Sequence, residues 1–231
     1  MNHISELAQL GTSTWLDDLS RERLVSGNLK EIISTKSIVG VTTNPAIFAA
    51  AMTNGTAYDA ELATLKESKA SADEAVYALA IEDVQNACDL FADIYSSTDG
   101  ADGRVSIEVD PRISDDPTAT LEQARELWSK VDRPNVMIKI PATTGSLPAI
   151  EDALAEGISV NVTLIFSVER YRAVIESFRT GLKRAAESGK DVATIHSVAS
   201  FFVSRLDTEV DKRLEAIGSE QALALRGKAG V

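Results

Sequence analysis

Short runs of β-branched residues alternate with longer segments of helical spacing along the whole chain. We expect strands at residues 13–17, 38–43, 105–110, 135–140, 159–166 and 194–202. Helices are expected at residues 20–34, 58–69, 73–96, 118–130, 146–156 and 168–188. Because strands that alternate with helices form βαβ units, the chain is predicted to build a parallel sheet, either doubly wound or closed as a barrel.

The residue pattern within the strands favours the barrel, because strand after strand has one apolar face and one polar face. In VSIEVD, Val105 and Ile107 share a face, and Glu108 lies on the other. A doubly wound sheet has helices on both sides and gives no reason for a recurring polar face. A (β/α)8 TIM-type barrel turns such a face inward, toward an active site at the C-terminal ends of the strands. The predicted fold class is therefore α/β, of this barrel type.

The number of βα units is smaller than a complete barrel requires. We count about six, whereas a TIM barrel has eight in about 250 residues. No linker rich in Gly, Ser or Pro divides the chain. We expect residues 1–231 to form a single (β/α) barrel domain that is truncated before its last strands, the alternative being an incomplete or different fold.

Composition limits the partners and the compartment. The net charge of -12 argues against nucleic acid or an anionic membrane surface, since both require a basic footprint. Small anionic substrates remain open. The chain has one cysteine, Cys88, so it has no internal disulfide, and we expect a cytoplasmic protein. The first residues lack the pattern of a signal peptide, and no apolar run is long enough for a membrane span.

Lys139 lies in the middle of NVMIKIPAT (135–143), which otherwise reads as a buried strand. Burial of a lysine is costly unless a partner or a function offsets it. Apolar surroundings favour the neutral amine, which can attack a carbonyl and form a Schiff base. The alternative is a structural ion pair with a carboxylate such as Glu108, one strand away.

Other polar side chains are expected beside Lys139 inside the barrel. Glu108 lies in mid-strand, and Asp17 ends the first strand. One carboxylate can move protons through a water, while the other takes a hydroxyl proton as a C–C bond breaks. Asn161 and Thr163 follow on the next strand and can orient that water or a substrate hydroxyl. Alternatively, they are barrel side chains hydrogen-bonded to one another.

In GVTTNPAIF (40–48), a strand runs through Thr42 into Asn44, and Pro45 suits the first turn of a helix. Asn44 can be the N-cap of that helix, which contributes about 1 kcal/mol. It can also hold a substrate hydroxyl at the end of the strand.

In SVASFFVSR (197–205), Ser200 ends a strand and Arg205 lies about one helical turn further on. A hydroxyl and a guanidinium at this position suit a substrate phosphate. Arg205 can equally be a surface residue of a helix.

Sequence motifs for metals, nucleotides and serine hydrolases are absent. His3 and His196 have no partners at ligand spacing, and there is no Walker loop, GxGxxG or GxSxG. Metal, nucleotide and serine-hydrolase functions therefore lack support from the residues.

Taken together, these segments resemble the transaldolase family. The matching segments, in family order and over essentially the whole chain, are WLDDLSRERL (15–24), GVTTNPAIF (40–48), VSIEVDPRIS (105–114), VMIKIPAT (136–143), SVNVTLIFS (159–167) and SVASFFVSR (197–205). TTNP and IKIPAT are the most specific of these. WLD followed by LSR is similar to the longer bacterial and plant-like branch of the family.

The resemblance implies a pentose phosphate pathway enzyme that transfers a dihydroxyacetone unit from a ketose phosphate, sedoheptulose 7-phosphate or fructose 6-phosphate, to an aldose phosphate. Lys139 then forms the Schiff base, and Glu108 is the acid/base that works through a water held with Thr163. Asp17 assists proton transfer at C–C cleavage.

The resemblance also implies a set of substrate-binding residues, which are Asn44, Thr42, Asn161, Ser200, Phe202 and Arg205. Asn44 and Asn161 hold hydroxyls of the donor, while Ser200 and Phe202 line the pocket. Arg205 contributes to the phosphate site, of which a second basic residue is not assigned. The resemblance implies neither a metal nor an organic cofactor.

Two alternatives to a transaldolase stay open. A related class I aldolase, such as a fructose 6-phosphate aldolase, has the same lysine and releases dihydroxyacetone. A catalytically silent barrel that acts as a scaffold pairs Lys139 with Glu108 instead. Whether the protein is a monomer or a homodimer is also open.

Overall fold

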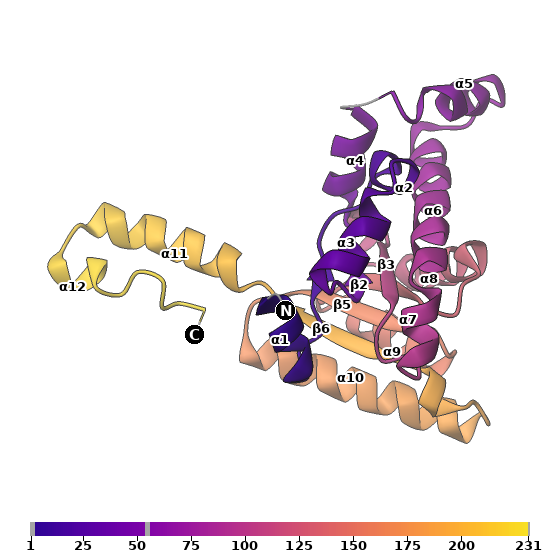
Figure 1. Ribbon diagram of the computed structural model, residues 1–231. Coiled ribbons are helices and arrows are strands. Elements are labelled where there is room, and N and C mark those ends of the chain that lie inside the picture. The colour runs from indigo at the N-terminus through magenta and orange to yellow at the C-terminus, as the bar shows by residue number, and fades with distance from the viewer. Residues whose placement is uncertain (1–2, 54–55, 231) are drawn as a thin grey trace.

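The protein, seen in a computed structural model that describes residues 3–53 and 56–230, has six parallel strands in one sheet (Figure 1). They are β1 (Trp15–Leu16), β2 (Gly40–Val41), β3 (Arg104–Glu108), β4 (Val136–Pro141), β5 (Val160–Ile165) and β6 (Ser197–Phe201). Their spatial order follows the chain from β1 to β6, and every neighbouring pair is parallel. A doubly wound sheet reverses its order at a switch point, whereas a barrel does not. The predicted barrel architecture, with six of its strands, is confirmed.

Helices connect or flank the strands (Figure 1). They are α1 (His3–Gln9), α2 (Arg21–Val25), α3 (Asn28–Lys36), α4 (Pro45–Thr53), α5 (Asp59–Glu67), α6 (Ala72–Leu90), α7 (Ala92–Ser97), α8 (Pro117–Val131), α9 (Leu147–Ala155), α10 (Val168–Glu187), α11 (Val203–Ile217) and α12 (Glu220–Leu223). Helix α6 packs against β3, α8 against β4, and α9 and α10 against β5. None of the helices in this part of the chain has the length and hydropathy of a membrane span.

The core lies between the strands and these helices. Val105 and Ile107 of β3 and Ile138 and Ile140 of β4 are buried there. Each such side chain contributes about 1.5–3 kcal/mol relative to an exposed one. The alternation of side chains therefore leaves the polar face of each strand for the inside of the barrel, as the sequence predicts.

Local capping explains where several helices begin. Ser71 and Glu74 form a capping box at α6, in which the Glu74 amide donates to Ser71 Oγ at 3.3 Å. Asp116 caps α8, with Pro117 at its first position, and accepts from the Ala119 amide at 3.0 Å. Both starts agree with the sequence prediction.

Two helix predictions were wrong in detail, and one helix was missed. The helix expected at 20–34 is divided into α2 and α3, because Gly27 adopts a left-handed φ of 77° between them. The helix expected at 73–96 is divided at Phe91. Helix α1 was not predicted at all, since its residues include no buried ones that would give an apolar stripe.

A bulge in β5 changes which side chains face the core. Leu164 has a φ of 60°, and the pairing with β6 shifts register between Val162 and Ile165. Ile165 is therefore buried, while Phe166 is exposed. The alternation that buries Val160 and Val162 therefore does not continue beyond Thr163.

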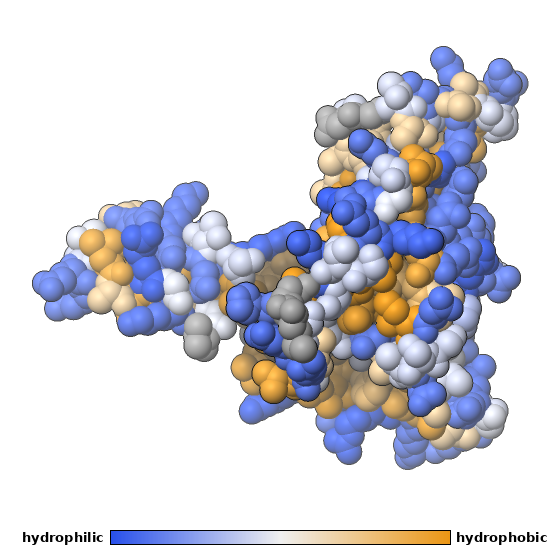
Figure 2. All heavy atoms as spheres, viewed as in Figure 1, coloured by the Kyte–Doolittle hydropathy of each residue, from blue (hydrophilic) through white to orange (hydrophobic). Residues whose placement is uncertain are grey.

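The sheet has two open edges. Within residues 3–53 and 56–230, β6 pairs only with β5, and β1 pairs only with β2. Val198 and Phe201 of β6 are exposed, and Figure 2 shows hydrophobic surface in the hollow around α1 and above α10. Helix α11 packs chiefly with α12, and the two extend away from the sheet (Figure 1).

Candidate active site

Lys139 lies on the inner face of β4 and is 5% exposed. Its Nζ donates to the backbone oxygen of Thr43, at the end of β2, at 3.0 Å. The same Nζ lies 3.4 Å from Glu108 Oε2. The two residues are opposite each other in the β3–β4 register. The predicted burial of this lysine is confirmed, and so is the ion pair that the sequence offered as the alternative explanation.

Glu108, the carboxylate beside Lys139 on the inner face of the barrel, is buried. Burial raises its pKa above the ordinary value of 4.5, and the neighbouring charge and hydrogen bond of Lys139 oppose that rise. Arg205 lowers the same pKa and Asp17 raises it. Asp17 itself is exposed, just after β1. The charges predicted for one site therefore act on a common carboxyl group.

Asn161 forms hydrogen bonds to two neighbours on the inner face. It follows Lys139 in the β4–β5 register. Its Nδ2 donates to Ser106 Oγ at 3.0 Å, and Ser200 Oγ donates to its Oδ1 at 2.9 Å. Asn161 and Ser200 are thus brought together as predicted. The alternative prediction, that Asn161 and Thr163 are hydrogen-bonded to one another, is wrong, because Asn161 bonds to Ser106 and Ser200 and Thr163 Oγ1 has no partner among the described residues.

Two buried hydroxyl groups have no hydrogen-bond partner among the described residues. They are Thr163 Oγ1 and Thr42 Oγ1. Thr163 is only 1% exposed. An unsatisfied buried hydroxyl costs about 1–3 kcal/mol, which a water or a substrate hydroxyl would recover. Both residues were predicted for such contacts.

Asn44 is the N-cap of α4. Its Oδ1 accepts a hydrogen bond from the Ile47 amide at 3.0 Å. The structural role that the sequence offered for Asn44 is therefore confirmed. The residue is only half-buried and borders two cavities, so the cap does not exclude contact with a ligand.

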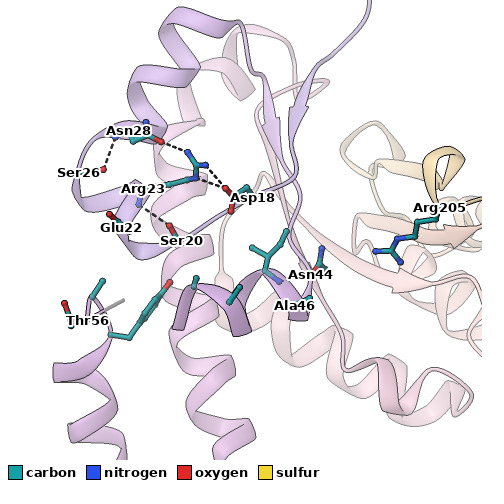
Figure 3. Close-up of a pocket in the computed structure, with 15 residues that line it drawn as sticks. Asp18, Ser20, Glu22, Arg23, Ser26, Asn28, Asn44, Ala46, Thr56 and Arg205 are labelled. Atoms are coloured by element: carbon teal, nitrogen blue, oxygen red, sulfur yellow. Dashed lines mark hydrogen bonds and ion pairs between the residues drawn. The ribbon is translucent and has the colours of Figure 1, made fainter. Parts of the chain in front are cut away.

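A cleft of about 1180 Å³ lies between α2, α4 and Arg205. Figure 3 shows Arg205 reaching toward Asn44 from the opposite wall. Arg205 is exposed, and its guanidinium lies 4.5 Å from the centroid of the Phe202 ring. Six of the predicted residues therefore fall into two groups. Asn44 and Arg205 border this cleft, whereas Lys139, Glu108, Asn161 and Thr163 lie inside the barrel.

Comparison with known proteins gives the family. Residues 14–231 match the model of a protein family described as "Transaldolase/Fructose-6-phosphate aldolase". The chain belongs to the transaldolase/fructose-6-phosphate aldolase family. The predicted resemblance is confirmed.

Several transaldolases are similar to this member of the family over nearly all of its residues. One from Mycolicibacterium smegmatis (strain ATCC 700084 / mc(2)155) is 60% identical over 229 residues, which are 99% of this chain and 62% of that protein. One from Kocuria rhizophila is 59% identical over 98% of this chain and 61% of the relative. One from Mycobacterium ulcerans is 58% identical over 99% and 61%. The chain thus spans about three fifths of the length of these relatives.

Some side chains of this family member were not predicted as parts of the site. Ser106 contacts Asn161, and it shares a strand face with Glu108, so alternation along β3 was a usable signal. The buried Arg21 forms ion pairs with three carboxylates far away in the sequence. Among the residues that the structure describes, no group of three or more His, Cys, Asp and Glu side chains is placed to bind a metal ion.

Proposed function

We propose that this chain carries the site of a transaldolase of the pentose phosphate pathway, a transferase that moves a dihydroxyacetone unit from a ketose phosphate to an aldose phosphate. The observation that carries the proposal is the buried Lys139 amine on the inner face of the barrel, 3.4 Å from the Glu108 carboxyl group. A buried amine beside a proton-transferring carboxyl group is what Schiff-base chemistry requires.

In the proposed first step, the neutral amine of Lys139 attacks the ketone carbon and forms a C–N bond. The carbonyl oxygen takes up two protons and leaves as water, which produces the Schiff base. Glu108 delivers and takes back protons through a water. The unpartnered hydroxyl of Thr163 supports this assignment, because it is free to hold that water.

In the second step, the bond between C3 and C4 of the donor breaks. Asp17 takes the proton of the C4 hydroxyl, and the aldose phosphate product leaves. The electron pair of the broken bond stays in the lysine-bound enamine, which then attacks the aldehyde carbon of the acceptor. Asp17 and Arg205 both act on the pKa of Glu108, in opposite directions, which supports a single site for the three residues.

The remaining predicted residues bind the substrate in this proposal. Asn44, Thr42 and Asn161 hold hydroxyl groups, and Ser200 and Phe202 line the pocket. Arg205 takes the phosphate, which agrees with its exposed guanidinium at the wall of the cleft. Asn161 and Ser200 are hydrogen-bonded to each other, so this bond must break before either side chain binds the substrate through the same atoms.

We further propose that residues 1–231 are one barrel domain that additional βα units complete. The open edges of β1 and β6 support this proposal. Sugar phosphates are the proposed partners, and the cytoplasm is the proposed compartment. The single Cys88, buried and free, fits a reducing environment.

Two other functions each have an observation in their favour. The name of the matching family includes fructose-6-phosphate aldolase, which keeps the aldolase alternative open. The ion pair between Lys139 and Glu108 is what a silent scaffold would contain.

Acceptor dependence separates these functions. With fructose 6-phosphate alone, a transaldolase releases at most one glyceraldehyde 3-phosphate per chain, because the dihydroxyacetone unit stays on Lys139. Addition of an aldose phosphate acceptor then restores turnover. Repeated release without an acceptor would replace the proposal by the aldolase, and no release under either condition would favour the scaffold.

A further inference from the structure

A buried charged cluster anchors the first residue of α2. Arg21 is 6% exposed and forms ion pairs with carboxylates of α5 and α6. Its Nε donates to Asp83 Oδ1, its Nη1 to Glu61 Oε1 at 2.6 Å, and its Nη2 to Glu82 Oε2 at 3.2 Å. Asp83 is fully buried. A guanidinium that satisfies several carboxylates at once holds its backbone in a narrow range of positions.

Tyr58 makes the cluster rigid in a second way. Its hydroxyl accepts from the backbone amide of Arg21 at 2.8 Å and donates to Asp83 Oδ2 at 2.6 Å. The Arg21 guanidinium also lies 5.2 Å from the centroid of the Tyr58 ring. Tyr58, which is 1% exposed, therefore fixes both the main chain and the side chain of Arg21.

The segment between β1 and Arg21 is short and carries Asp17. At its start, the Leu16 backbone oxygen accepts from the Thr42 amide at 2.9 Å. In its middle, Leu19 is fully buried in the core. At its end, Ser20 caps α2 and accepts from the Arg23 amide at 3.3 Å. Asp17 is the exposed residue of this otherwise anchored segment.

We propose that Arg21, Tyr58 and Asp83 are positioning residues, which set the place of Asp17 at the mouth of the barrel. They act through the main chain of residues 17–20 and touch no reacting atom. The inference rests on the proposed function, because it concerns the proton transfer assigned to Asp17. A displacement of about 1 Å in such a group costs on the order of 100-fold in rate.

A purely stabilising role makes a different prediction. The cluster would then keep α2, α5 and α6 together, and its loss would lower the fraction of folded protein without changing the chemistry of what remains. The two roles differ in the partition between Schiff-base formation, which uses Lys139, and C–C cleavage, which uses Asp17.

Borohydride trapping with fructose 6-phosphate measures this partition in Tyr58→Phe. The variant keeps the aromatic ring and loses only the hydroxyl. Reduction before cleavage leaves the whole ketose phosphate on Lys139, and reduction after cleavage leaves a dihydroxyacetone unit, so the two adducts differ in mass. The inference predicts that the uncleaved share rises at least tenfold in Tyr58→Phe. It predicts no rise in the control Tyr171→Phe, whose ring packs on Phe201. Tyr171 belongs to α10, which lies well away from α2 (Figure 1).

An unchanged ratio of the two adducts, with only the total adduct reduced, would overturn the inference and leave the proposed function intact. Absence of both adducts in the unmodified protein would instead reject the proposed function. Amide hydrogen exchange then tests directly whether the cluster anchors the segment that carries Asp17. We expect residues 17–21 to exchange at least tenfold faster in Tyr58→Phe while α10 is unchanged, and equal exchange in residues 17–21 would refute the anchoring.

Discussion

Lys139 Nζ and Glu108 Oε2 lie 3.4 Å apart across the β3–β4 pair, and both side chains are less than a tenth exposed. The amine has a second acceptor in the Thr43 backbone oxygen, so it does not depend on the carboxylate alone. Because burial raises the pKa of Glu108, this carboxyl group takes up a proton more readily than an exposed glutamate does. The pair is therefore suited to proton exchange as well as to a structural role.

The raised pKa of Glu108 predicts the pH dependence of adduct formation. If the carboxylate is the base, the rate falls as the pH drops through the pKa of the folded state, which lies above the ordinary 4.5. The acid limb should therefore begin at a higher pH than an unperturbed glutamate gives. Rates of borohydride-trapped adduct between pH 4 and 8 measure this limb. Glu108→Gln should lower the rate about 100-fold to 10,000-fold and lack the limb.

The raised pKa of Glu108 also makes the stability of the fold depend on pH. A carboxyl group whose pKa is higher in the folded state binds protons on folding, so its contribution to stability declines as the pH rises from the unfolded to the folded pKa. For the rate of adduct formation, an acid limb at the ordinary pKa of glutamate would contradict the account of a desolvated Glu108.

Thr163→Val tests whether the unpartnered hydroxyl of Thr163 holds a catalytic water. The substitution keeps the shape of the side chain and removes a buried Oγ1 that has no partner among the described residues. We expect the free energy of unfolding to stay the same or to rise by about 1 kcal/mol, while adduct formation slows at least tenfold. Urea unfolding and trapping rates measure the two effects. A marked loss of stability would mean that the hydroxyl has a structural partner.

Arg205→Ala tests the phosphate site. Loss of the guanidinium should raise the KM for fructose 6-phosphate at least tenfold and leave the reaction of unphosphorylated fructose nearly unchanged. Arg213→Ala is the matched control, since Arg213 lies on the same helix and pairs with Glu209 at 2.9 Å. Equal effects on the two sugars would show that Arg205 acts on the fold and not on the phosphate.

Arg104→Met tests an unusual buried charge at the N-terminal end of β3. Arg104 Nε donates to the Gly100 backbone oxygen at 2.7 Å, whereas Nη1 and Nη2 are buried without a partner among the described residues. The guanidinium lies 5.2 Å from the centroid of the Tyr95 ring, but no carboxylate is paired with it among the described residues, so removal of this buried charge should raise the Tm. It should also raise the pKa of His196, which burial and the charge of Arg104 hold below 6.5.

Calorimetry and a proton NMR titration of the His196 ring check these outcomes. A lower Tm together with an unchanged His196 pKa would show that Arg104 has acceptors that satisfy it. His3, which is exposed, provides a reference resonance in the same spectra.

The arrangement of the barrel could be predicted because it follows from alternation. Glu108, Lys139 and Asn161 occupy neighbouring positions in consecutive strands, and the period of two places each on the inner face. The family motifs then supplied the roles of these residues, which alternation does not contain.

Other features depend on contacts that no local pattern encodes. The bulge at Leu164 breaks the period within a single strand. The pairing of Arg21 with Asp83 joins residues 62 positions apart, and no local sequence pattern near either residue predicts it. The capping role of Asn44 was foreseen because Pro45 follows it directly, which is a local signal.

The most direct test of the central claim is peptide mapping of the protein after reaction with fructose 6-phosphate and borohydride. The account predicts a dihydroxyacetone-sized mass increase on the peptide that contains Lys139, and its loss in Lys139→Met. No adduct on that peptide, in folded protein with the expected mass, would contradict the claim that this lysine is a nucleophile.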